Sequence, residues 1–111
     1  KAGGNWIHVE PVVNSFVCNV GDMLDRLTRG RFLSAPHRVQ NPSGQHRQSF
    51  AFFFDPNFNA EVRAIESTAE VRDNKPERWD HASVHEFQGT YGDYLIGKVS
   101  KVFPELGRKV L

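Results

Sequence analysis

Apolar and polar residues alternate in short stretches along the first 65 positions of this chain. Alternation with a period of two is typical of a β-strand with one buried face, because successive side chains point to opposite sides. Each stretch ends at residues that favour turns, such as glycine, proline, asparagine and aspartate. The pattern predicts about five strands of a mostly antiparallel sheet. They lie at 6–10, 16–20, 31–39 with a boundary at Ala35-Pro36, 47–54 and 60–65.

The stretch 47–54 is the longest predicted strand. It is apolar on both faces beyond Ser49, so both sides of it are expected to be covered, with the phenylalanines at 50, 52 and 54 in the core. Cys18 is expected to be a buried, unreactive thiol, because no base or cation is near it in the sequence. Residues 23–28 show helical spacing, but two glycines bound a segment too short to be a stable helix alone. We expect a turn or a bent strand there.

The pattern changes after position 65, where a polar stretch begins. From Thr90 onward the apolar positions recur every three or four residues, and Thr90 with Asp93 forms a capping box. These features predict an amphipathic helix that Pro104 ends or kinks. The predicted architecture is mainly β and a single domain over 1–111, with sheet strands in 1–65 and a polar loop and helix in 66–111.

Composition narrows the classes of function. The 111 residues are 39% hydrophobic, which suits one small domain. Basic residues number 14 and acidic residues 13, so the net charge of +1 gives no field that would attract nucleic acid. No apolar run reaches the roughly 18–20 residues of a membrane span, and no signal-peptide pattern is present. One cysteine forms no internal disulfide, so a cytoplasmic location is expected. The abrupt start at Lys1 suggests a piece of a longer protein.

Three side chains in the middle of the chain could carry chemistry. A neutral imidazole on a rigid strand is a good ligand for iron(II), and His37 is the candidate. An isolated histidine is more commonly a core residue bonded to a carbonyl, so the surrounding pattern decides. Arg47 and Ser49 are two apart and would share a strand face about 6.6–6.8 Å apart. A guanidinium fork and a hydroxyl can hold one carboxylate there, although a strand-edge ion pair is the alternative for the arginine.

These residues belong to a longer series of motifs. The series comprises Asn19-x-Gly21-Asp22, Thr28-x-Gly30-Arg31, Ser34-x-x-His37-Arg38-Val39 and Arg47-x-Ser49. In order and spacing it resembles the C-terminal half of the iron(II)- and 2-oxoglutarate-dependent dioxygenases, in the branch that includes isopenicillin N synthase and the plant-type hormone and flavonoid oxygenases. The resemblance implies the C-terminal half of a double-stranded β-helix, or jelly roll, followed by a C-terminal amphipathic helix. It also implies an oxygenase that hydroxylates or otherwise oxidises a small organic substrate with dioxygen, while 2-oxoglutarate is decarboxylated to succinate.

The same resemblance implies a role for each candidate residue. His37 is the distal iron ligand, Arg47 and Ser49 hold the far carboxylate of 2-oxoglutarate, and Val39 lines that pocket. Weaker candidates for contact with substrate are Phe53, Asn57 and Phe58. The implied cofactors are iron(II) and 2-oxoglutarate, with ascorbate as a further candidate. The family's other two ligands form a His-x-Asp pair further upstream than the 36 residues before His37 allow. The upstream half of the same enzyme is therefore the implied partner, and this segment alone is expected to be inactive.

Two other groups of residues contain the side-chain types that bind metals. His8 and Glu10 would share a strand face, but the tryptophan, valine and proline around them match a family strand that supplies no ligands. His81 and His85 are four apart, as on a metal-binding helix, and follow Asp80. Without cysteines or a third strong ligand, we expect a surface turn there. The alternative function is a non-catalytic jelly-roll module that binds a partner through unpaired strand edges.

Overall fold

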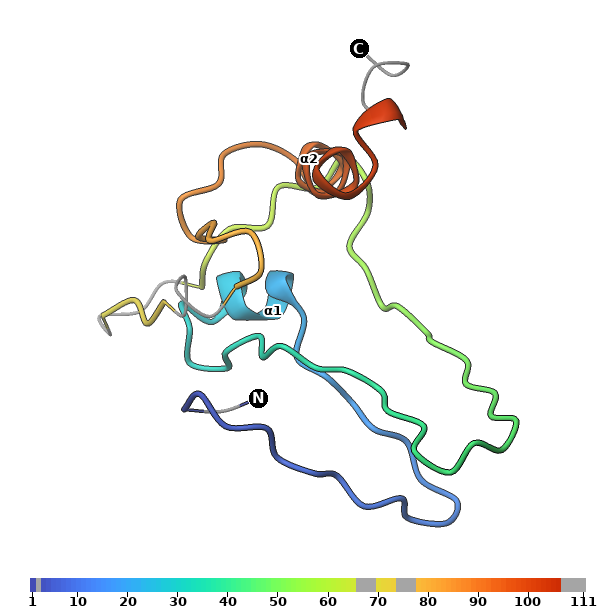
Figure 1. The fold of residues 1–111 in the computed structure, drawn as a ribbon. Coiled ribbons are helices and arrows are strands. Elements are labelled where there is room, and N and C mark those ends of the chain that lie inside the picture. The colour runs from blue at the N-terminus through green and yellow to red at the C-terminus, as the bar shows by residue number, and fades with distance from the viewer. Residues whose placement is uncertain (2, 66–69, 74–77, 107–111) are drawn as a thin grey trace.

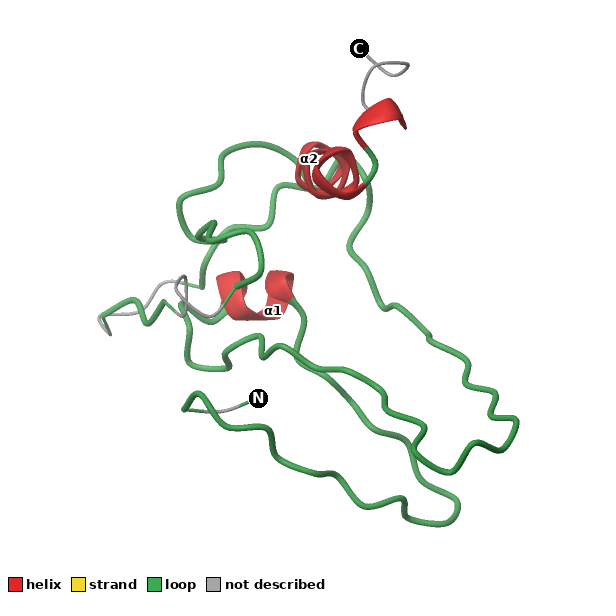
Figure 2. Cartoon of the chain, viewed as in Figure 1, coloured by secondary structure: helices red, strands yellow, loops and turns green. Residues whose placement is uncertain are grey.

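The computed structural model describes residues 1, 3–65, 70–73 and 78–106. Its main helices among these residues are α1 (Asp22–Leu27) and α2 (Tyr91–Val102), and a single helical turn follows at 104–106. Figure 2 shows that irregular chain joins them. Within the described ranges the predicted strands run as segments without a paired ladder, and Asn5 alone forms an isolated bridge. The jelly roll therefore stays a prediction.

Two long excursions of the chain lead away from the helices toward the same side (Figure 1). We call residues 5–20 the first arm and residues 32–57 the second arm. The second arm reverses direction at a turn in which Asn41 Nδ2 donates to the carbonyl of Gln45 at 2.7 Å. The radius of gyration is 16.1 Å, compared with about 13 Å for a compact domain of this length. The arms are the reason for this expansion.

The arms touch each other near the start of the chain. The terminal amino group of Lys1 donates to the carbonyl of Pro36 at 2.7 Å. The guanidinium of Arg38 lies 4.2 Å from the centre of the Trp6 ring. A cation over an aromatic face is attracted by the ring quadrupole, so this contact holds one leg of the second arm beside the first.

The predicted burial of the arms is not found in this structure. Phe50 and Phe54 are 95% exposed and Phe52 is 89% exposed, so the expectation of a core strand covered on both faces is wrong for this chain as it stands. Cys18 is also exposed, in contrast to the buried thiol expected from the sequence. Burial requires a second layer, and no described segment lies over these side chains.

Helix α1 replaces the turn or bent strand expected at residues 23–28. A helix of six residues is unstable alone, because nucleation fixes several residues for few hydrogen bonds. Tertiary bonds supply the missing stabilisation here. Arg26 Nε donates to the carbonyl of Val62 at 2.7 Å. Asp25 is fully buried against Arg78 and His85 of the C-terminal segment, which we define as residues 78–106.

Helix α2 confirms the prediction made from periodicity. The Thr90 hydroxyl accepts from the backbone of Asp93, and the Asp93 carboxylate accepts from the Thr90 backbone amide at 2.8 Å, so the capping box is complete. The helix ends at the C-cap residue Phe103, directly before Pro104. No helix among the described residues is long and apolar enough to cross a membrane.

The two helices and the segments between them form a packed region, which we define as α1, residues 58–65, residues 78–90 and α2. The amides of Tyr91 and Gly92 donate to the carbonyls of Ala60 and Phe58, both at 2.8 Å. These bonds attach the start of α2 to residues 58–65, which directly follow the second arm. Val84 is only 1% exposed in the centre of this region.

Candidate functional site

His37 lies in the second arm with its imidazole exposed. Its Nδ1 is 3.1 Å from the carbonyl oxygen of Ala35. A hydrogen bond at that position places the proton on Nδ1 and leaves the lone pair of Nε2 free. A carbonyl partner of this kind orients the ring of many metal-ligating histidines. This geometry is compatible with Nε2 as a metal ligand, and the role of His37 stays a prediction.

Arg47, Ser49 and Val39 are also exposed on the second arm. Among the described residues, no hydrogen bond or ion pair occupies the side chain of Arg47 or Ser49. His37 and Val39 precede the turn at 41–45, whereas Arg47 and Ser49 follow it, and the two legs separate beyond the turn (Figure 1). The structure does not bring the imidazole and the guanidinium together into one cavity, and their shared role stays a prediction.

The weaker substrate candidates lie at the end of the second arm and directly after it. Phe53 is exposed. The Asn57 side-chain oxygen accepts from the amide of Asn59 at 2.9 Å, which makes it part of a local turn. The Phe58 ring packs directly on Gly92, because a Cβ added to that glycine would lie 2.4 Å from a ring carbon. In this structure Phe58 therefore serves the attachment of α2.

A buried group of charged side chains lies between α1 and the C-terminal segment, and sequence reasoning did not anticipate it. We call Asp22, Asp25, Arg78, His85 and Tyr94 the charged cluster. Arg78 donates to Asp22 Oδ1 at 2.6 Å and to Asp25 Oδ2 at 2.8 Å. His85 Nε2 lies 3.1 Å from Asp25 Oδ1, and the Tyr94 hydroxyl donates to Asp22. Asp25 has no exposed surface and Arg78 is 6% exposed.

The electrostatics of the charged cluster follow from these contacts. Burial acts to raise the pKa of Asp22, but hydrogen bonds from Tyr94, Ser34 and Arg78 outweigh it and hold that pKa below its usual value. Burial acts to lower the pKa of Arg78, but the bond to Asp22 outweighs it and raises that pKa. Burial and the bond to Asp22 raise the pKa of Tyr94. All three groups keep their ordinary charge states near neutral pH.

Asp80 anchors the side of α2 that faces residues 78–85. Its Oδ2 accepts from Lys98 at 2.7 Å and from Lys101 at 2.8 Å, while its side chain is only 3% exposed. Burial acts to raise the pKa of Asp80, and the bonds from the two lysines hold it well below its usual value. Two cations thus already occupy this carboxylate.

Neither alternative metal group has the arrangement of a site. Asp80 is bound to lysines, and His85 faces Asp25 across the charged cluster. His8 Nε2 lies 3.2 Å from Glu10 Oε1 at the surface, so these two do share a face as predicted. No group of three histidine, cysteine or acidic side chains among the described residues could hold a metal ion.

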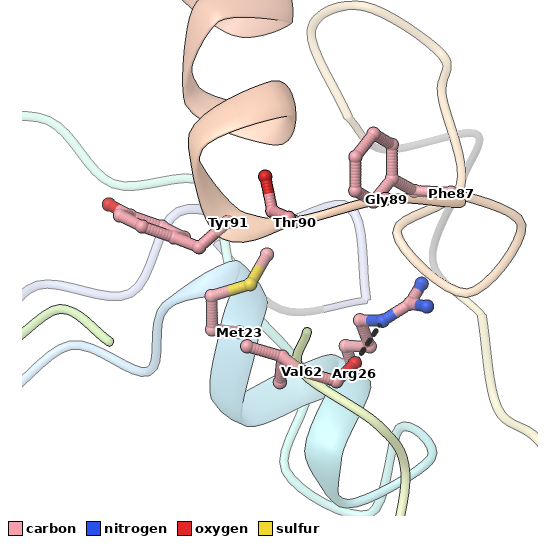
Figure 3. A pocket seen from close by; sticks show the side chains of 7 residues that line it. All are labelled: Met23, Arg26, Val62, Phe87, Gly89, Thr90 and Tyr91. Atoms are coloured by element: carbon pink, nitrogen blue, oxygen red, sulfur yellow. Dashed lines mark hydrogen bonds between the residues drawn. The ribbon is translucent and has the colours of Figure 1, made fainter. Parts of the chain in front are cut away.

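Two small open pockets border α1. One has an empty volume of about 160 Å³ (Figure 3). Its wall includes Met23 and Arg26 of α1, Val62, and Tyr91 at the start of α2, and Figure 3 shows Arg26 bonded to the Val62 carbonyl. The other pocket has an empty volume of about 440 Å³ and is lined by Arg26, Arg29, Ala64, Val71 and His85. Both volumes include space that is open to solvent. Neither includes a predicted site residue, so both belong to the junction of α1 with the C-terminal segment.

Curated proteins similar to this chain carry the names of oxidoreductases. The chain is 50% identical over 109 residues to a probable iron/ascorbate oxidoreductase of Dictyostelium discoideum, which covers 96% of this chain and 30% of that protein. It is 44% identical over 108 residues to a 1-aminocyclopropane-1-carboxylate oxidase of Dictyostelium mucoroides, and the alignment covers 95% of this chain and 29% of that protein. It is 39% identical over 103 residues to a homoarginine-6-hydroxylase of Arabidopsis thaliana, and the alignment covers 93% of this chain and 28% of that protein. The chain thus spans less than a third of the length of these relatives.

No solved structure matches the chain. The family model of the 2OG-Fe(II) oxygenase superfamily matches residues 1–56, which is half of the sequence and includes both arms almost entirely. The match contains His37, Arg47 and Ser49, the three residues to which the motif series assigns the iron and co-substrate. This chain belongs to the 2OG-Fe(II) oxygenase superfamily.

Proposed function

We propose that the protein carrying this chain is an iron(II)- and 2-oxoglutarate-dependent oxygenase that acts on a small organic molecule. The observation that carries the proposal is the motif series from Asn19 to Ser49, which lies within the matched residues 1–56. The names of three relatives, an iron/ascorbate oxidoreductase, an oxidase and a hydroxylase, support an oxidation with dioxygen. Ascorbate is a further proposed cofactor because it stands in the name of one of them.

His37 would supply one protein ligand of the iron. The donor chemistry fits, since its Nδ1 faces the Ala35 carbonyl and its Nε2 is left free on an exposed face. When bound, iron(II) with 2-oxoglutarate activates dioxygen and the co-substrate leaves as succinate and carbon dioxide. The role of His37 would be to bind the iron through Nε2 from a fixed direction.

Arg47 and Ser49 would hold the distal carboxylate of 2-oxoglutarate. Among the described residues no side chain competes for either of them, so the guanidinium fork and the hydroxyl are both available to an anion. A bidentate pair fixes the direction of a carboxylate as well as its charge. Val39, on the same arm, would form part of the apolar wall of that pocket.

The remaining ligands are proposed to come from a His-x-Asp pair on a segment that precedes this one in the intact enzyme. A facial site needs two histidines and one carboxylate. The same segment would pair with the two arms and complete the jelly roll. The exposed Phe50, Phe52 and Phe54 support this, because three large apolar side chains in alternation suit a strand that another layer covers.

The exposed arms also favour a second candidate function. Unpaired strand-like segments with apolar side chains can bind another chain by strand addition. A non-catalytic module of this kind would use the same arms but would need neither His37 nor Arg47 for metal or co-substrate. Iron binding that depends on 2-oxoglutarate separates the two candidates.

The proposal is tested by anaerobic titration of the full protein with iron(II) and 2-oxoglutarate, followed by the visible charge-transfer band of the chelated complex. Arg47→Ala should raise the concentration of 2-oxoglutarate needed for half of the band by about 10- to 100-fold, since a hydrogen bond to a charged group contributes about 1.5–3 kcal/mol. Arg47→Lys should give an intermediate value because it keeps the charge without the fork.

Arg63→Ala is the matched control. Arg63 is an exposed arginine bound to Glu61 at 2.7 Å outside the arms, so its removal should leave the titration unchanged. A 2-oxoglutarate requirement that is the same in Arg47→Ala and in the unaltered protein would remove Arg47 from this role. The absence of any band from the unaltered protein would overturn the oxygenase proposal itself.

A further inference from the structure

A fully buried carboxylate links the packed region to the second arm. Asp25 Oδ2 accepts from the backbone amide of Ser34 at 2.8 Å and from Arg78 at 2.8 Å. Ser34 is three residues before His37. A hydrogen bond from a backbone amide to a charged acceptor in a dry environment is about twice as strong as a neutral one. Asp25 therefore fixes the place where the second arm leaves the helical part of the molecule.

The link from Ser34 to His37 is short and stiff. Pro36 has a fixed φ, and the residue before a proline is restricted to extended conformations, so Ala35 has little freedom. The carbonyl of Ala35 faces His37 Nδ1 at 3.1 Å. Because the two residues between are restricted in this way, the position of Ser34 restrains the direction of the His37 imidazole.

Arg78 fixes Asp25 in turn. Its two terminal nitrogens bind Asp25 and Asp22 separately, so the two carboxylates of α1 are held at a set spacing by one planar guanidinium. Tyr94 of α2 binds the other oxygen of Asp22. The C-terminal segment is thus joined through buried bonds to the same carboxylate that holds the Ser34 amide.

We propose that Asp25 and Arg78 are positioning residues for His37, and that through them the C-terminal segment sets the geometry of the iron ligand. The inference rests on the proposed function in so far as His37 binds iron. It extends that function to residues outside the matched stretch 1–56, since Arg78 lies beyond it. Partners that orient a metal ligand affect metal affinity by about 10- to 100-fold when they are removed.

The test combines two measurements on the full protein. Hydrogen exchange of the peptide spanning residues 32–37 reports the Ser34 bond without any metal, and the titration with iron(II) at saturating 2-oxoglutarate reports ligand geometry. Asp25→Ala should accelerate exchange at 32–37 at least tenfold more than in α2 and weaken iron binding about 10- to 100-fold. Asp25→Asn keeps an oxygen that can accept from Ser34, so it should restore most of both signals.

Two further variants complete the design. Glu61→Ala is the matched control, because Glu61 is a carboxylate whose partner Arg63 is exposed. If Asp25→Ala fails to fold, Arg78→Lys decides instead, since lysine keeps the charge but cannot bridge both aspartates. Arg78→Lys should then accelerate exchange at 32–37 and weaken iron binding in the same direction.

The outcomes separate this inference from the function on which it rests. Unchanged exchange at 32–37 and unchanged iron affinity in the decisive variant would overturn the positioning role. Equal acceleration throughout the protein would overturn it as well, because the cluster would then only stabilise the fold. If the unaltered protein binds no iron, the proposed function fails, while faster exchange at 32–37 would still establish the link from Asp25 to the His37 turn.

Discussion

The packed region and the second arm differ in which side chains they bury. In the packed region a few small elements are joined by buried charges, of which Asp25 is wholly enclosed. The second arm contains a run of phenylalanines, yet these side chains are exposed and no ladder pairs its backbone among the described residues. The residues proposed for chemistry lie on the arm. The residues that determine where the arm begins lie in the packed region.

This difference shows that a segment of this protein packs against the rest only where another segment contacts it, whatever the hydrophobicity of its own side chains. An apolar strand gains nothing from its side chains until a second layer removes water from them. The buried bonds from Arg78 to Asp22 and Asp25, by contrast, hold short elements together. Breaking such a pair is costly because an uncompensated charge is left behind.

The largest effect on stability is expected from a methyl group added at Gly30, in the turn that follows α1 and borders the packed region. Gly30 has a φ of +77°, and a Cβ there would lie 1.9 Å from the carbonyl oxygen of Arg72. Gly30→Ala should lower the free energy of unfolding by about 2–4 kcal/mol, the sum of left-handed strain and overpacking. Denaturant unfolding of the variant measures this loss.

Gly44 provides the comparison within the second arm. It has a φ of +68°, but nothing lies within 4 Å of its added Cβ. Gly44→Ala should therefore cost only about 1 kcal/mol, the conformational part. Equal losses at the two glycines would contradict the distinction drawn between the packed region and the arm.

Acidification should give the next largest effect, and again in the packed region. The pKa values of Asp22 and Asp80 are lowered in the folded protein, by hydrogen bonds that outweigh burial. Their contribution is complete above the unfolded pKa of 3.8 and is lost as the pH falls below it through the folded values. Thermal melts between about pH 6 and about pH 2 should show a loss on the order of 2 kcal/mol, allowing for solvent around the lysines.

A single lysine variant shows whether Asp80 shares in this loss. Lys101 is about half exposed and binds Asp80 at 2.8 Å. Lys101→Met should leave the melting temperature less dependent on acid below about pH 4, because Asp80 then titrates closer to its ordinary pKa. An acid profile identical to that of the unaltered protein would remove the Asp80 bonds from the explanation.

The smallest effect is expected at the start of α2. Thr90→Ala removes the side chain that accepts from the Asp93 amide, and should cost about 1 kcal/mol. Thr90→Ser keeps the hydroxyl and should cost much less. The loss should appear as faster hydrogen exchange in the first turn of α2, with no change in the second arm. Faster exchange in the arm as well would show that the two regions are coupled more strongly than their contacts indicate.

The sequence predicted α2 correctly and α1 incorrectly, for a physical reason. Thr90, Asp93 and Pro104 act within a few residues of one another, so a local pattern contains the whole of their effect. Helix α1 is too short for local bonds to suffice and depends on Val62 and Arg78, which are 36 and 53 to 56 positions away. Spacing along the chain gives no sign of such partners.

The candidate site divides in the same manner. The motif series identified the family and the residues proposed for iron and 2-oxoglutarate, because residue type and spacing suffice for that. It gave no sign that Asp25 binds the Ser34 amide, since Asp25 is an ordinary polar position in a segment expected to be a turn or a bent strand. Burial expected for Phe50, Phe52, Phe54 and Cys18 was also wrong here, because a pattern states which residues suit a covered face and not whether a cover is present.

The sequence by itself therefore determined the family, the capped C-terminal helix and the identity of the residues with suitable chemistry. Only the tertiary structure decided that α1 is a helix, that Asp22 and Asp25 meet Arg78 and Tyr94, and that the turn before His37 is bound to a buried carboxylate. The reason is how far apart in the sequence the interacting residues lie. Caps and motifs act between neighbours in the chain, whereas buried charges are stable only when distant segments bring opposite charges and donors together and exclude water from them.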